Sequence, residues 1–251
     1  WEPPLPKPLA EAGVEYTLLD DTPFKMVGLT DDDLFGPYVT EEQGYPLKVF
    51  GNVMHLRYAI PWRPVEEVIE WLRGQARAHP GGVAVSGDDG EKFGLWPHTW
   101  DHCWGEDGWV ERFFTALEEN ADWLHTRPLG EVAAEQAPLG RVYLPSASYE
   151  EMMRWALPPD SFAALGTVEG ELEDRGRDDI RRFLGGGFWR SFLRRYDEAN
   201  QMHKKMLWVS RKANAMAPGE AQDRALDHTW SAQCNCAYRH RLFGATCLSH
   251  I

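Results

Sequence analysis

The densest group of chemically active side chains lies in one acidic loop, residues 87–98. Asp88, Asp89 and Glu91 place three carboxyl groups within four residues, directly after the β-branched run 82–86. Carboxylates this close repel one another, so at least one of them is expected to have a raised pKa. A carboxylic acid that is still protonated near neutral pH is what general-acid cleavage of a glycosidic bond requires.

Two other interpretations of this loop stay open. Acidic loops flanked by glycine are often solvated turns, and some hold a weakly bound cation. The spacing does not match an EF-hand, which makes calcium the weaker rival. Side chains alternate along a strand, so Asp88 and Asp89 should point to opposite sides and only one can face a barrel axis.

Strand and helix patterns alternate in the first half of the chain. Short apolar runs predict strands at 14–19, 47–50, 56–60, 82–86 and 141–144. Apolar residues at helical spacing predict helices that start at Pro64 and near Val110. Such alternation implies parallel pairing, and in parallel sheets and barrels the chemistry collects where strands end in loops. Carboxylates at strand ends, Asp20 and Asp21 included, are therefore the residues of interest.

The second half of the chain is helical by pattern. Helices are predicted at 149–156, 160–184 with interruptions, 188–216 and 220–238. The run Gly185–Gly187 could be mistaken for a phosphate loop, but no strand precedes it and no Lys-Ser or Lys-Thr pair follows it. We interpret this run as a connection between two helices.

Composition narrows the class of partner. The formal net charge of -13 argues against a nucleic acid held by phosphate neutralisation, and no uncharged run is long enough to cross a bilayer, so no membrane partner is expected. Four cysteines in 251 residues are not a disulfide framework, which favours a reducing compartment and a cytoplasmic location.

Metal sites are conceivable but lack the usual spacing. The two candidate groups are Cys234 and Cys236 with His240, and His98 and His102 with Cys103. Neither contains the paired CxxC of structural zinc, so no metal or cofactor is expected.

Twelve tryptophans are an unusual feature of the composition, because aromatic planes pack cores but also stack on sugar rings. The chain opens at Trp1 without Met, so we expect a processed protein or a piece of a longer one.

Several strings resemble one enzyme family. DDGEKFGLWPHTW at 88–100 resembles the fourth sequence motif of glycoside hydrolase family 57, in its α-amylase and 4-α-glucanotransferase branch. The stretch Trp1–Thr17 is similar to the segment after the third motif of that family, and Ala232–Tyr238 to the start of the fifth. Phe188–Met206 is similar to the helical middle region, so the resemblance runs from end to end.

The resemblance implies an α/β fold, an incomplete (β/α)7-type, TIM-like barrel followed by a helical bundle. It places the end of the catalytic barrel in residues 1–148 and a helical middle domain, packed on the barrel, in 149–251. Family members cleave α-1,4-glucosidic bonds of α-glucans with retention of configuration, by double displacement with a Glu nucleophile and an Asp acid/base. The implied partner is an α-glucan or a maltooligosaccharide.

Residue roles follow from aligning the motifs. Asp89 corresponds to the acid/base, and the substrate-binding positions are Glu91, Trp96, Trp1, Asn235 and His240. Trp96 and Trp100 are candidates for acceptor subsites, where excluding water would favour transfer over hydrolysis. The family's nucleophile would lie three residues before Trp1, so we expect these 251 residues to be inactive alone. The alternative is a non-catalytic, truncated module that retains glucan binding.

Overall fold

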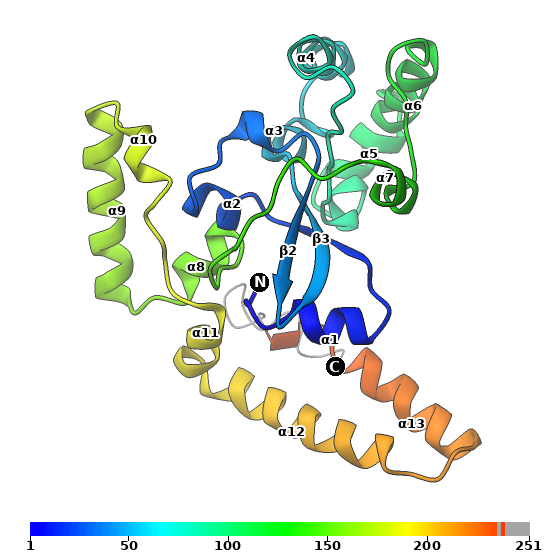
Figure 1. Ribbon diagram of the computed structural model, residues 1–251, viewed down its shortest axis with the longest axis vertical. Coiled ribbons are helices and arrows are strands. Elements are labelled where there is room, and N and C mark those ends of the chain that lie inside the picture. The colour runs from blue at the N-terminus through cyan, green and yellow to red at the C-terminus, as the bar shows by residue number, and fades with distance from the viewer. Residues whose placement is uncertain (235–236, 239–251) are drawn as a thin grey trace. The chain divides into compact units, whose positions relative to one another are not determined.

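The computed structural model describes residues 1–234 and 237–238, and the chain forms two compact units. The first consists of Trp1–Tyr149 with Leu172–Gly185, and the second of Glu150–Glu171 with the chain from Gly186 onward. Figure 1 shows helices around a small sheet in the first unit and mostly helices in the second.

The elements before residue 150 are α1 (Pro6–Glu11), β1 (Tyr16–Leu19), α2 (Thr22–Met26), the 3-10 helix η1 (Asp31–Asp33), β2 (Pro37–Glu42), β3 (Tyr45–Gly51), α3 (Met54–Ala59), α4 (Val65–Ala78), the 3-10 helix η2 (Gly90–Phe93), α5 (Thr99–Trp104), α6 (Trp109–Glu119) and α7 (Leu129–Glu135). Those after it are α8 (Glu150–Trp155), α9 (Pro159–Asp174), α10 (Asp178–Arg181), α11 (Trp189–Arg195), α12 (Asp197–Asn214) and α13 (Glu220–Ser231). No helix within the described ranges combines the length and the apolar character that crossing a membrane requires.

The sheet has three strands in the order β1-β3-β2. β1 pairs with β3 in parallel, from Tyr16 opposite Lys48 to Leu19 opposite Gly51, and β2 pairs with β3 antiparallel. A two-residue turn joins β2 to β3, and both of its residues have positive φ, 54° at Gln43 and 81° at Gly44. Such turns match the right-handed twist of paired strands, which explains a hairpin between two neighbouring segments.

Alternating side chains of β3 divide the core between the two faces of the sheet. Leu47 and Val49 join one cluster with Phe24, and Phe50 joins the other with Val85. A third cluster packs α3 and α4 against α5 and α6 around the buried indole of Trp109. Both faces of the central strand are therefore covered, as expected of a strand with a parallel neighbour.

Several predicted strands turn out differently. The segment 56–60 is not a strand, because its buried residues Leu56 and Ala59 recur at helical spacing in α3. Residues 82–86 are extended but make only isolated bonds, from the Val53 N–H to the Val85 carbonyl (2.8 Å) and from the Val83 N–H to the Phe35 carbonyl (3.1 Å). In 141–144 a single parallel bridge joins Arg141 to Val39. The described residues thus combine many helices with one small sheet and do not show a barrel.

The second unit confirms most of the predicted helices. The predicted helix 188–216 is interrupted at Tyr196, where ψ is 89°, so it becomes α11 and α12. The run Gly185–Gly187 lies between α10 and α11, which confirms a connection between helices. A Cβ atom on Gly186 would lie 2.5 Å from the carbonyl carbon of Met153, and the Gly187 N–H bonds to the Met153 oxygen at 2.5 Å. The glycines are needed there because two stretches of backbone touch.

Candidate active site at the carboxyl ends of the strands

Three chain segments end side by side at one edge of the sheet. β1 and β3 are parallel, so Asp20 and Asn52, which follow them, emerge at the same edge. The Asn52 N–H bonds to the Leu19 carbonyl at 2.8 Å. Its side-chain amide donates to the Gly87 carbonyl (3.0 Å) and accepts the Gly87 N–H (2.9 Å). Asn52 thereby fixes the start of the acidic loop against the end of β3.

Asp88, the first carboxylate of the loop, is held by two cations. Its side chain is 12% exposed and bonds to the Lys92 ammonium, while the Arg57 Nε lies 3.6 Å from its other oxygen. The Lys92 ammonium also donates to the Arg57 carbonyl at 2.7 Å, and the Lys92 side chain is only 2% exposed. The Asp89 N–H donates to Asp88 Oδ1 at 2.8 Å. Every one of these bonds fixes the loop, so Asp88 has a structural role.

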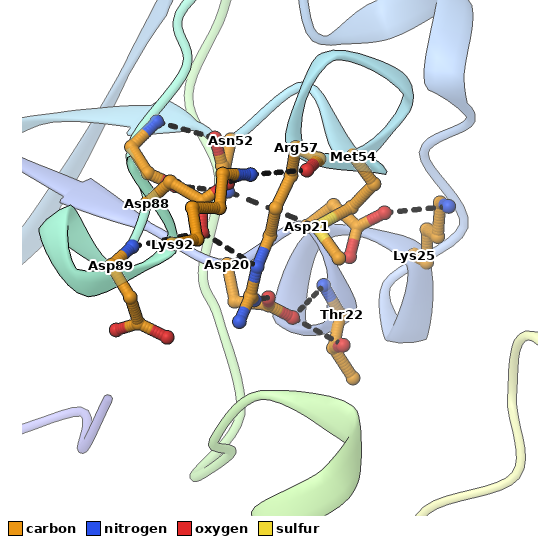
Figure 2. A network of polar contacts seen from close by, with 11 residues as sticks. Asp20, Asp21, Thr22, Lys25, Asn52, Met54, Arg57, Asp88, Asp89 and Lys92 are labelled. Carbon is orange, nitrogen blue, oxygen red and sulfur yellow. Dashed lines mark hydrogen bonds and ion pairs between the residues drawn. The ribbon is translucent and has the colours of Figure 1, made fainter. Parts of the chain in front are cut away.

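Arg57 extends the network to the end of β1. Figure 2 shows its guanidinium between Asp20 and Asp88, and its Nη1 lies 3.8 Å from Asp20 Oδ2. The other oxygen of Asp20 accepts the Thr22 N–H (3.1 Å) and the Thr22 hydroxyl (2.5 Å). Of the three loop carboxylates whose repulsion the sequence suggests, Asp88 is thus the one that Arg57 and Lys92 neutralise. Arg57, Lys92 and Asn52 were not predicted as site residues, although Lys92 lies one helical turn after Asp88.

Asp21 faces a different partner and is buried. Its carboxylate lies 2.6 Å from the Lys25 ammonium, which also reaches Asp31 at 2.8 Å. Burial raises the pKa of Asp21 to about 6, against the opposing effect of Lys25, and the charges of Asp20 and Asp31 raise it further. Asp21 and Lys25 lie at the two ends of the short helix α2, which follows β1.

Asp89 takes no part in the ion pairs that hold Asp88. It is exposed, and Figure 2 shows its side chain pointing away from the network that holds Asp88. Among residues 1–234 and 237–238, none bonds its carboxylate. The two aspartates therefore point in different directions, as the alternation of side chains predicts. Such a fixed backbone with an open carboxyl group suits an acid that must meet a substrate oxygen.

Tryptophans surround the segment that follows Asp89. Trp96, a predicted substrate-binding residue, lies nearly parallel to Trp62, with ring centroids 6.3 Å apart and planes 16° apart. Trp62 also lies parallel to His102 at 6.4 Å. Trp100 and Trp104 lie 6.4 Å apart on α5 and are exposed. Sequence reasoning missed Trp62 and Trp104, although the density of tryptophan between 96 and 104 could have drawn attention to the second.

The remaining predicted positions are less informative. The Trp1 amine donates to the Ala147 carbonyl (2.7 Å), its indole N–H donates to the Leu144 carbonyl (3.3 Å), and the ring packs beside the core cluster that contains Phe24. Its role in substrate binding stays a prediction, as does that of Glu91, which is exposed. Asn235 and His240 lie outside the described residues.

The imidazole and thiol groups have ordinary partners. His102 Nε2 lies 2.8 Å from the Pro61 carbonyl, and its Nδ1 lies 3.5 Å from Asp107. Cys103 is a buried free thiol, and burial raises its pKa. No group of three potential metal-binding side chains occurs in the described part of the chain.

Comparison with known proteins extends over the whole chain. Residues 1–145 match the family model "Glycosyl hydrolase family 57", and 187–251 match "Alpha-amylase/4-alpha-glucanotransferase, middle domain". The chain is similar to alpha-amylase 1 of Dictyoglomus thermophilum, 43% identical, and to 4-alpha-glucanotransferase of Thermococcus litoralis, 40% identical. Each match covers 100% of the chain and 37% of the relative, so the chain spans little more than a third of their length.

The crystal structure of 4-alpha-glucanotransferase from Thermococcus litoralis has a similar fold. It superimposes with a TM-score of 0.82 at 40% identity, over 95% of this chain and 36% of the other. The likeness covers both units.

Proposed function

We propose that this chain, which belongs to glycosyl hydrolase family 57, forms part of an enzyme that hydrolyses or transfers α-1,4-linked glucan chains. Family membership confirms the resemblance of the sequence motifs. Relatives named alpha-amylase and 4-alpha-glucanotransferase support hydrolysis and transfer of the glucan chain as alternative outcomes. We further propose that residues 1–148 belong to an incomplete (β/α)7-type barrel and 149–251 to a helical middle domain.

We also propose a cytoplasmic location for the protein, which the free thiols at Cys103 and Cys234 support.

In the proposed mechanism Asp89 is the acid/base of a retaining pair. Its carboxylic acid donates a proton to the glycosidic oxygen while a carboxylate nucleophile attacks the anomeric carbon, and the leaving chain departs as an alcohol. The Asp89 carboxylate then takes a proton from water or from a sugar hydroxyl, whose oxygen displaces the nucleophile. Water gives hydrolysis and a sugar hydroxyl gives transfer.

The observation that carries this assignment is the contrast between two adjacent aspartates. Asp88 is held by Lys92 and Arg57, whereas the Asp89 carboxylate points away from that network. A group that exchanges a proton with substrate must be able to reach it, whereas the Asp88 carboxylate is occupied by Lys92 and Arg57. Of the two, Asp89 is the residue suited to acid/base work.

The test is Asp89→Asn in the full-length protein, with Asp122→Asn, another exposed aspartate, as the matched control. We expect Asp89→Asn to lower kcat on maltoheptaose by about 10²–10⁴-fold, the usual contribution of a general acid/base, and to leave maltoheptaose binding within about twofold. Asp122→Asn should change neither quantity.

A second substrate separates acid catalysis from loss of structure. Fluoride leaves without a proton, so formation of the glycosyl-enzyme from a maltosyl fluoride should be affected much less by Asp89→Asn. Near-native kcat on maltoheptaose in the variant would refute the assignment. A native protein that binds maltoheptaose without any turnover would favour the non-catalytic, glucan-binding alternative.

A further inference from the structure

A cavity of about 450 Å³ lies in the first unit, between the segment that follows β1 and the helices α3 and α4. The described residues that line it all fall between Lys25 and Gln75, so the acidic loop 87–98 is not among them. This volume is typical of small-molecule sites in proteins. The cavity is therefore a candidate site for a ligand that the acidic loop does not hold.

One wall of the cavity is built from aromatic rings. The imidazole of His55 is stacked on the indole of Trp71, with ring centroids 4.2 Å apart and planes 14° apart, and the Phe35 ring lies 6.4 Å from the same indole. Phe35 is buried, and Trp71 packs against the core cluster that contains Val53. The core thus holds these rings in place, so the wall is a flat apolar surface that needs no rearrangement to receive a ligand.

Hydrogen-bonding groups of both kinds adjoin this wall. Arg63 and Gln75 supply donors, and Asp31 and Asp32 supply acceptors. Within the described part of the chain, the side chains of Arg63 and Gln75 have no hydrogen-bond partner, whereas the Lys25 ammonium is held by Asp31 at 2.8 Å. Donors that are not committed to the protein can bond to a ligand without breaking an existing contact.

The formal charges around the cavity cancel. Lys25 and Arg63 contribute two positive charges, and Asp31 and Asp32 contribute two negative ones. Burial, and to a lesser extent Arg63, lower the pKa of His55, so its ring adds no charge at neutral pH. An anion would meet the two carboxylates and a cation the two basic groups, while an apolar molecule would remove water from all four. These groups favour a neutral ligand that is rich in hydrogen bonds.

A short oligosaccharide has this chemistry. The C–H face of a pyranose ring is flat and apolar, and each hydroxyl at its edge both donates and accepts hydrogen bonds. The ring face can pack on the aromatic wall while the hydroxyls bond to guanidinium, amide and carboxylate groups at the same time.

We propose that this cavity is a second binding site, which takes a short neutral oligosaccharide such as maltose, with a sugar ring against the His55 and Trp71 wall and its hydroxyls bonded to Arg63 and Gln75. The inference goes beyond the proposed function, because it requires binding at the cavity and no cleavage of a bond there.

The test uses Met54, which lines the cavity, as a local reporter in the full-length protein. Its ¹³C-methyl NMR signal is assigned by its loss in Met54→Leu. We expect maltose to shift this signal saturably, and Arg63→Leu to weaken that binding about tenfold, as loss of a charged hydrogen-bond donor would give. Arg112→Leu, which changes an exposed arginine on α6, is the matched control and should leave the affinity unchanged.

The Met54 signal alone does not separate the cavity from the acidic loop, because the Asn52 amide that holds Gly87 lies 3.8 Å from the Met54 sulfur. Turnover of maltoheptaose is therefore measured on the same variants. Arg63→Leu should leave kcat and KM within about twofold of the native values, since it affects binding at the cavity only. Gln75→Leu provides a second variant with the same expected pattern if Arg63→Leu does not fold.

Three results would overturn the inference: a Met54 signal that maltose does not shift, equal affinity for maltose in the native protein and the folded variant, or inorganic phosphate binding as tightly as maltose. The proposed function fails separately. A full-length protein that binds maltose at the cavity, with the expected loss in Arg63→Leu, but cleaves no glucan would contradict the proposed function and support this inference.

Discussion

Replacing Lys92 by methionine tests whether the acidic loop is held by a buried ion pair. Methionine keeps most of the apolar stem of this side chain, which is 2% exposed, and removes the ammonium, which bonds to both Asp88 and the Arg57 carbonyl. The carbonyl loses a donor, at a cost of about 1–3 kcal/mol, and Asp88 keeps only Arg57, 3.6 Å away. Breaking a buried pair from one side costs about 3–5 kcal/mol in total.

The assay is thermal unfolding of Lys92→Met beside a surface control. At about 2–4 °C per kcal/mol for a domain of this size, the expected fall in Tm is about 6–20 °C. Arg224→Gln also removes a short ion pair, 2.5 Å to Glu220, but those side chains are 67% and 85% exposed, so the loss should cost no more than about 1 kcal/mol. Equal shifts in Tm for the two variants would refute the argument from burial.

A double variant identifies the partner. If Asp88 is the group that Lys92 neutralises, Asp88→Asn combined with Lys92→Met should lose less stability than the sum of the single changes, by about 1–3 kcal/mol. Strict additivity would mean that the ammonium acts mainly through the Arg57 carbonyl. The same variants should lose activity only in part where they are folded, because Asp89 itself is unchanged.

Two further predictions concern positions outside that network. Gly186→Ala should destabilise the protein by about 1–3 kcal/mol, because the new Cβ would lie 2.5 Å from the Met153 backbone. Gly166→Ala should instead stabilise the protein by about 0.5–1 kcal/mol, because Gly166 lies in the interior of α9 and its new Cβ would have no other atom within 4 Å. Chemical denaturation measures both, and a stabilising Gly186→Ala would contradict the close approach. Asp21 has a folded pKa of about 6, above its unfolded value of about 3.9, so its favourable contribution is present below pH 4 and is lost as the pH rises towards 6. The difference in Tm between native protein and Asp21→Asn should therefore fall between pH 4 and pH 6, and a rise over that range would show that Lys25 dominates instead.

The sequence predicted β1 and the middle of β3, because short apolar runs are a local signal. The functional role of the acidic loop stays a prediction. The different directions of Asp88 and Asp89 follow from the alternation of side chains along the chain, which is also local. The segment 56–60 shows where local information fails: a short apolar run fits a strand or a buried helix equally well. The segment forms part of α3 because of how it packs against other elements, and residues 56–60 alone do not reveal those elements.

The network around Asp88 was missed for a related reason. Asp20, Arg57 and Asp88 are more than 30 residues apart in sequence, and Asp20 comes close to Arg57 because β1 and β3 run in parallel. Trp62 likewise meets Trp96 across 34 residues, a juxtaposition made by the tertiary fold. The hairpin from β2 to β3 could have been found, since a glycine next to Gln43 between two strand-like runs is a turn pattern.

The amide of Asn52 has a consequence for how this protein could be re-engineered. Because both of its polar atoms hold the backbone of Gly87, the first residue of the acidic loop takes its position from the sheet and not from the residues that follow. The backbone that carries the acid is thus tied to the sheet, whereas α5, which follows it, packs against α6 through the buried Cys103. Exchanging exposed residues of α5 between relatives should therefore leave the position of Asp89 unchanged.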